Sequence, residues 1–128
     1  MDLCDQNDIQ ALLARHGFHF AKALGQNFLI RGDVAEDIAA AGCVPGCGVL
    51  EVGPGIGALT VQLARRAEKV VSVELDKRLP PVLAETMADY DNFTLIEGDV
   101  MALDLAVVTA EKFPGLPAVL CANLPYNS

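Results

Sequence analysis

Short apolar runs in this chain are followed directly by glycine, acidic or amide residues, which are the residue types that bind small polar ligands. The first such segment, Gly53-Pro54-Gly55-Ile56-Gly57, follows residues 49–52. Glycines allow a backbone to turn sharply and to approach a ligand closely, because no Cβ stands in the way. A helix that begins at Ala58 would also direct its free N–H groups toward that ligand. The segment therefore predicts a cofactor loop.

The spacing of these glycines fits two classes of cofactor. Gly53, Gly55 and Ala58 give the dinucleotide pattern G-x-G-x-x-A, whereas including Gly57 gives G-x-G-x-G, which is usual in methyltransferases that use S-adenosylmethionine. Glu74 ends the next apolar run, about 20 residues further on, and its carboxylate can accept hydrogen bonds from both hydroxyls of a ribose. Because both cofactors contain a ribose, Glu74 does not distinguish between them.

Two more apolar runs end in polar residues. Asp99 follows residues 94–97 and can accept from an exocyclic adenine amine, while the next backbone N–H can donate to a ring nitrogen. Residues 123–126, Asn-Leu-Pro-Tyr, follow residues 118–121. The oxygen of Asn123 and a carbonyl held rigid by Pro125 can bind both hydrogens of an exocyclic amine, and Tyr126 offers a face to an unstacked base. Hydride transfer needs no such arrangement.

A scaffold of alternating strands and helices must bring these segments together. Apolar periodicity predicts strands at 49–52, 70–75, 94–97 and 118–121, and helices at 8–16, 33–42, 58–67, from Pro80 onward, and near 105–111. Crossovers of this length predict an α/β fold with a parallel sheet and helices on both faces. The binding residues then follow the carboxyl ends of the strands.

The first two helices carry more detailed predictions. Asn7 or Asp8 is expected to cap the first helix, and Asp33 with Glu36 to form a capping box for the second. An apolar stripe on the second helix is expected from Val34, Ile38 and Ala41. Residues 18–32 show no clean period and are interpreted as a loop.

Taken together, these motifs resemble the KsgA-type ribosomal RNA adenine dimethyltransferases, whose relatives include the Erm methylases and the mitochondrial transcription factor B proteins. The resemblance is carried by residues 24–29, 50–60 and 123–127, with 73–76 and 98–99 between them in the same order. It implies a Rossmann-like class I methyltransferase fold with an incomplete sheet made of its first four strands. Residues 1–128 would form the N-terminal part of the catalytic domain, without its C-terminal strands and helical RNA-gripping domain.

The resemblance also implies a role for each candidate residue. For S-adenosylmethionine, the implied contacts are Gln26, Asn27 and Leu29 at the methionine end, Gly53 and Gly55 at the amino acid portion, Glu74 at the ribose, Asp99 and Val100 at the adenine, and Asn123. The implied catalytic residues are Asn123, Leu124, Pro125 and Tyr126. The implied reaction is dimethylation of N6 on two adjacent adenosines of small-subunit rRNA, by a cytoplasmic protein that is monomeric when full length and acts on immature small subunits.

Three alternatives remain open at this point. Leu124 and Asn127 favour the KsgA branch over an Erm-type methylase of the large subunit. A dinucleotide-dependent oxidoreductase would account for the glycines and Glu74, but it would leave residues 24–29 and 123–126 unexplained. A non-catalytic RNA-binding assembly factor is the third.

Composition limits other functions. The net charge of −8 argues against a broadly basic RNA-binding surface, and Arg15, Lys22 and Arg31 are the main candidate RNA contacts. The chain has no apolar run long enough to span a membrane. Its four cysteines are too scattered for a zinc site, so no metal is expected.

Overall fold

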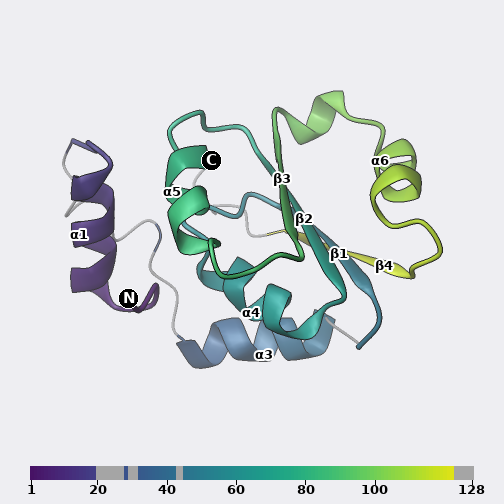
Figure 1. Cartoon of the computed structure of the whole chain (residues 1–128), viewed down its shortest axis with the longest axis horizontal. Helices are drawn as coiled ribbons and strands as arrows, with labels where there is room; N and C mark the ends of the chain where they lie inside the picture. The colour runs from purple at the N-terminus through teal and green to yellow at the C-terminus, as the bar shows by residue number, and fades with distance from the viewer. Residues whose placement is uncertain (20–27, 29–31, 43–44, 123–128) are drawn as a thin grey trace.

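A parallel four-stranded sheet forms the centre of the chain. The structure is a computed structural model, and it describes residues 1–19, 28, 32–42 and 45–122. The strands are β1 (Gly48–Val52), β2 (Lys69–Glu74), β3 (Phe93–Glu97) and β4 (Ala118–Ala122). They lie in the order β3-β2-β1-β4 and all pairs are parallel, as the sequence predicts (Figure 1). All four carboxyl ends therefore lie at one edge, where the sequence predicts the site.

Helices cover both faces of this sheet because its strand residues are apolar on both sides. The helices are α1 (Gln6–Arg15), α3 (Gly32–Gly42), α4 (Ala58–Arg66), α5 (Pro80–Thr86) and α6 (Leu105–Lys112), with a short 3-10 turn η1 (Val100–Ala102). Val49 and Val70 pack with α3 and α4 on one face. Leu50 and Val71 pack on the opposite face with Val108 of α6. Figure 1 shows α6 on the other side of the sheet from α3 and α4.

Two helix starts differ from those expected. Asp5, rather than Asn7 or Asp8, caps α1, and its side chain accepts a hydrogen bond from the Asp8 N–H at 3.1 Å. An aspartate three residues before that N–H can reach it, whereas Asp8 already lies in the first helical turn. Helix α3 begins at Gly32, so Asp33 lies inside its first turn instead of preceding it.

The expected apolar stripe on α3 is wrong. Val34 and Ile38 are 38% and 39% exposed, whereas Ala35 and Ala39 are fully buried against α4 and the sheet. The small alanine side chains allow α3 to lie close to α4, and that close approach selects the face that is buried. The apolar spacing predicts that Val34 and Ile38 are buried, but the residues that pack against the neighbouring helix are Ala35 and Ala39.

Helix α1 packs beside the sheet on a separate core. Ile9, Leu12 and Leu13 contact Val82 of α5 and Ile56 of the glycine-rich loop. Glu85 of α5 also binds α1, with 2.6 Å to the Arg15 guanidinium and 3.0 Å to the His16 ring. The N-terminal helix is thus attached to the loop that follows β1. Among the described helices, none has the length and apolar character needed to cross a lipid bilayer.

Candidate cofactor site

The glycine-rich loop between β1 and α4 depends on left-handed backbone conformations. Gly53, Gly55 and Gly57 have φ values of 74°, 59° and 98°, which L side chains rarely adopt. Gly57 is the N-cap of α4 and supplies no side-chain hydrogen bond to the first turn. The N–H groups of that turn therefore point toward the carboxyl edge of the sheet, where an anionic group can accept from them.

Glu74 lies at the end of β2 beside this loop, as predicted. Its side chain is 8% exposed, and its Oε1 accepts a hydrogen bond from the Gly55 N–H at 3.2 Å. Its Oε2 accepts from the Asp76 N–H at 2.9 Å. Each carboxylate oxygen has two lone pairs, so both can still accept a hydroxyl hydrogen. The hydrogen bond thus holds the acid beside the loop, an arrangement suited to a ribose and the groups attached to it.

Asp99 follows β3 at the same edge, because the Gly98 N–H donates to the Glu74 carbonyl at 2.9 Å. The exposed Asp99 side chain accepts from the Met101 N–H at 2.9 Å and so caps η1. Val100, the first residue of η1, is half-buried. The structure therefore brings Asp99 and Val100 to the carboxyl edge near Glu74, and their contact with an adenine ring stays a prediction.

The other predicted site residues lie outside the described part of the chain. These are Gln26, Asn27, Leu29, Asn123, Leu124, Pro125 and Tyr126. Two described residues, Ala122 and Phe28, are next to these segments in the sequence. Ala122 pairs with Val52 in register, so the described part of β4 ends at the same edge as β1. Phe28 packs against the core that contains Ile56, and a Cβ added to Gly55 would lie 3.1 Å from its ring.

Phe28 and Glu51 are two residues near this site that the sequence reasoning did not single out. Glu51 is fully buried in β1, and its Oε1 accepts hydrogen bonds from the Thr60 and Ser72 hydroxyls at 2.6 and 2.7 Å. Burial raises the pKa of Glu51 to about 7, against the effect of these two hydrogen bonds. The available signal was an acid inside the apolar run Val-Leu-Glu-Val.

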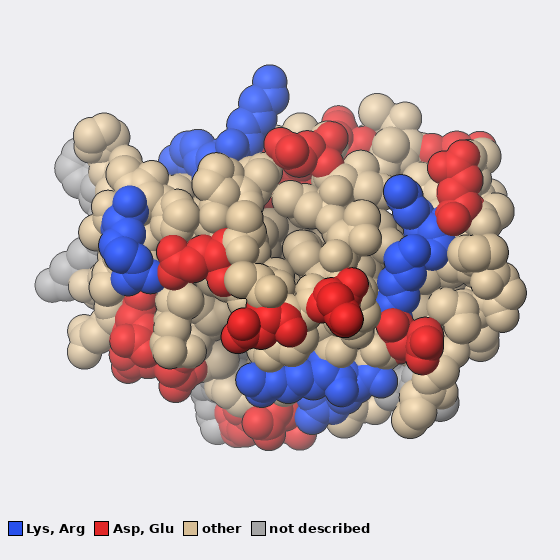
Figure 2. All heavy atoms as spheres, in the orientation of Figure 1, with Lys and Arg blue, Asp and Glu red and all other residues tan. Residues whose placement is uncertain are grey.

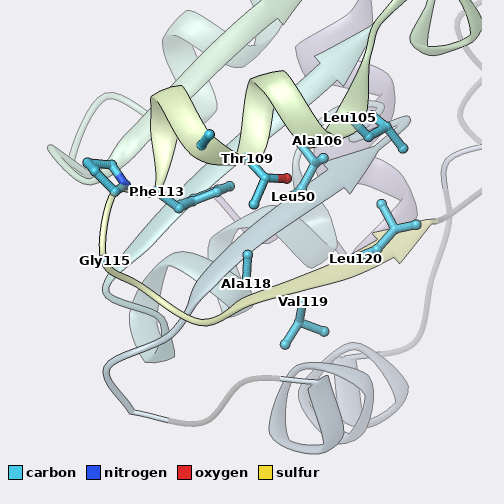
Figure 3. A pocket seen from close by; sticks show the side chains of 11 residues that line it. Leu50, Leu105, Ala106, Thr109, Phe113, Gly115, Ala118, Val119 and Leu120 are labelled. Carbon is cyan, nitrogen blue, oxygen red and sulfur yellow. The ribbon is translucent and has the colours of Figure 1, made fainter.

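A hollow lies between α6 and β4, away from these residues (Figure 3). It encloses about 720 Å³ and is lined by apolar side chains such as Leu50, Phe113 and Leu120. None of the described residues that line it is ionisable, so it holds no group for acid–base chemistry. The carboxyl edge of the sheet, with its acids and free N–H groups, is therefore the candidate site.

The surface around this core carries mixed charge. Figure 2 shows basic side chains in separate groups, with acidic side chains between them. Asp76 holds Arg78 at 2.7 Å just after β2, and the hydrogen bond from Arg78 lowers the pKa of Asp76. The described part of this face therefore shows no continuous basic patch.

Residues 17–128 match the family model described as ribosomal RNA adenine dimethylase. The chain belongs to this family. Ribosomal RNA small subunit methyltransferase A of Geobacillus thermodenitrificans is 50% identical over 127 residues, which cover 98% of this chain and 43% of that protein. The protein of the same name from Streptococcus gordonii is 45% identical over 98% of this chain and 44% of its own length. The chain thus spans less than half the length of these relatives.

Solved structures of two methyltransferases share the fold. The 23S rRNA methyltransferase ErmE superposes with a TM-score of 0.61 and 32% identity, covering 73% of this chain and 36% of that one. A dimethyladenosine transferase from Plasmodium falciparum superposes with a TM-score of 0.57 and 28% identity, covering 74% and 32%. The Rossmann-like class I methyltransferase fold expected from the sequence is confirmed. Membership of the rRNA adenine dimethylase family is confirmed as well.

Proposed function

We propose that this chain binds S-adenosylmethionine at the carboxyl edge of its sheet. The observation that carries the proposal is the hydrogen bond between the Gly55 N–H and Glu74, which joins the glycine-rich loop to the acid at the end of β2. Glu74 would accept from the ribose hydroxyls, and the uncapped first turn of α4 would face the carboxylate of the methionine portion. Gln26, Asn27, Leu29, Asp99 and Val100 would complete the cofactor site.

We further propose that the whole protein dimethylates adenine N6 at two adjacent adenosines of small-subunit rRNA. The names of the relatives at 45–50% identity support the small subunit as the source of the RNA. S-adenosylmethionine supplies a methyl group already activated by its sulfonium. The protein therefore has to orient the amine more than to remove its proton. The proposed partner is the immature small ribosomal subunit, in the cytoplasm.

Residues 123–126 would position the acceptor. The Asn123 side-chain oxygen and the Leu124 carbonyl would accept the two N6 hydrogens, so that the nitrogen lone pair points along a fixed direction. Pro125 would hold that carbonyl in place, and Tyr126 would stack on the adenine. Asn123 would also contact the cofactor, which places acceptor and methyl donor side by side.

Calorimetric titration of the chain with S-adenosylmethionine, S-adenosylhomocysteine and NAD tests the cofactor assignment. Binding of the first two ligands without NAD is expected. Glu74→Ala should weaken that binding about 10-fold or more, because a hydrogen bond to a charged group contributes roughly 1.5–3 kcal/mol. Glu97→Ala is the matched control, since Glu97 pairs with Glu74 in register but is exposed at the end of β3. NAD binding in place of S-adenosylmethionine would contradict the assignment.

An Erm-type activity on the large subunit is the second candidate, because ErmE is among the structural neighbours. Incubating the protein and labelled S-adenosylmethionine with each type of immature subunit separates the two candidates. Methyl transfer to adenines of the small subunit alone is expected. Transfer to large-subunit RNA would favour the Erm-type function.

A further inference from the structure

Glu51 is an acidic residue placed where an apolar one would be expected. It lies in the central strand β1 between Leu50 and Val52, and its side chain has no exposed surface. A buried carboxyl group is costly unless its oxygens are hydrogen-bonded. Its Oε1 is bonded twice, but its Oε2 is buried with no hydrogen-bond partner among the described residues. An acid that is buried at this cost calls for a functional explanation.

The partners of Glu51 belong to the elements that form the cofactor site. Thr60 lies in the first turn of α4, directly after the glycine-rich loop. Ser72 lies in β2, two residues before Glu74, and pairs with Glu51 in register. On the other side of β1, Cys121 of β4 is in register with Glu51. The carboxyl group thus hydrogen-bonds to the helix that follows the loop and to the strand that carries the ribose acid. Its own strand, β1, lies beside the strand that leads to residue 123.

The surroundings leave the charge of Glu51 sensitive to a nearby cation. Facing it are the Thr60 hydroxyl from α4, Ser72 and Glu74 from β2, and Cys121 from β4, while α3 contributes Ala35 and Ala39 to the same core. The described groups that act on it are thus neutral or acidic. Burial raises its pKa to about 7, and Glu74 adds to that shift. A positive ligand at the site would favour the ionised form.

We propose that Glu51 is a positioning residue that holds the glycine-rich loop through Thr60 and Ser72, and whose buried charge makes the site prefer a sulfonium cofactor to a neutral thioether product. This inference rests on the proposed function. S-adenosylmethionine and S-adenosylhomocysteine differ by one methyl group and one positive charge. A carboxylate buried under the site is weakly screened by salt, so it attracts the charged ligand selectively. Release of the spent cofactor would follow from the loss of that attraction.

The direction in which pH changes the ligand preference follows from the ionisation of Glu51. Glu51 ionises as the pH rises through 7, so the preference for S-adenosylmethionine over S-adenosylhomocysteine should increase over the same range. Glu51→Gln keeps an oxygen that can accept from both hydroxyls and removes the titrating charge. The amino groups of the two ligands also titrate, but they do so equally in both proteins. The difference between wild type and variant therefore isolates Glu51.

The experiment measures the Kd of both ligands for the chain by calorimetry near pH 6 and near pH 8. The Kd of S-adenosylhomocysteine divided by the Kd of S-adenosylmethionine should rise between pH 6 and pH 8. This rise should be at least about threefold larger in the wild type than in Glu51→Gln. Ser72→Ala provides a second variant. It removes one donor to the carboxylate, so the pH at which the ratio changes should move upward.

Each outcome decides the matter. Equal pH dependence in wild type and Glu51→Gln, with both ligands bound, overturns the inference and leaves the proposed function standing. If wild-type protein binds neither ligand, the proposed function fails and the inference with it. If Glu51→Gln does not fold, the Ser72→Ala shift decides alone, and an unmoved profile overturns the inference.

Discussion

Two residues of the proposed site, Glu74 and Asn123, would serve different substrates, Glu74 the cofactor and Asn123 the acceptor. Glu74 is already held by backbone N–H groups from the loop and from Asp76, so its carboxylate is oriented before any ligand arrives. Such pre-orientation lowers the entropy that binding must overcome. Asn123 would act on the other substrate, because it follows the strand next to β1.

Asn123→Ala is expected to abolish methyl transfer while weakening cofactor binding only moderately. The side-chain oxygen is proposed to orient the amine, and a misplaced nucleophile loses the benefit of alignment, which reaches several kcal/mol. Methylation of immature small subunits and calorimetric binding of S-adenosylmethionine by the full-length protein measure the two effects separately. Near-normal turnover of the variant would contradict the proposed role of Asn123.

Glu51 and Glu74 show what single residues in a sequence can and cannot indicate. The sequence indicates Glu74 because it ends an apolar run at a known distance from the glycines, and the structure places it beside Gly55. The local sequence does not indicate a role for Glu51, because its partners Thr60 and Ser72 are ordinary residues in other elements. Only the register of β1 with β2 brings them together. Contacts between elements of this kind are not visible in local patterns.

At the scale of elements, the start of α4 is tightly constrained. A Cβ on Gly57 would lie 2.9 Å from the Thr86 Oγ1, and the residue has a φ of 98°. Gly57→Ala should therefore destabilise the chain by about 2–3 kcal/mol, through backbone strain and steric overlap together. Urea unfolding followed by circular dichroism measures this change.

Gly46→Ala is the matched control for that measurement. Its φ of 85° is also left-handed, but a Cβ there would meet nothing within 4 Å. It should cost about 1–2 kcal/mol, from strain alone. Combining Gly57→Ala with Thr86→Ala should recover part of the difference between the two glycine variants. Equal costs at Gly46 and Gly57 would show that the contact with Thr86 does not matter.

The sequence predicts the order and type of the helices and strands, but it does not always predict which face of a helix is buried. Strands β1 to β4 fall within one residue of their predicted bounds, because continuous apolar runs are typical of a sheet covered on both faces. Pro80 and Pro81 lie in the first turn of α5, as their missing N–H groups favour. For α3 the apolar spacing predicts the wrong buried face, since the buried face depends on how closely α4 approaches.

For the molecule as a whole, Glu51 should make stability depend on pH. Its pKa rises from 4.5 to about 7 on folding, so the folded state binds more protons than the unfolded state between these values. Stability from this group is therefore full below about pH 4.5, falls as the pH rises, and stays low above about pH 7.

Urea unfolding of wild type and Glu51→Gln at about pH 5 and pH 8 tests this dependence. The wild type should lose about 2–3 kcal/mol relative to the variant across that range, because one pKa unit corresponds to about 1.4 kcal/mol. The carboxyl is fully buried, so solvent screening reduces this little. A constant difference between the two proteins would contradict a raised pKa.

Helix α1 packs away from the centre of the sheet, and its side chains surround Ile56 in the middle of the glycine-rich loop. Ile56 is 1% exposed, so the loop cannot move outward without pulling an apolar side chain away from Leu12 and Leu13. Opening of the loop and detachment of the helix should therefore occur as one event. In hydrogen–deuterium exchange, a ligand that binds only to the loop should slow exchange along the first helix of the chain.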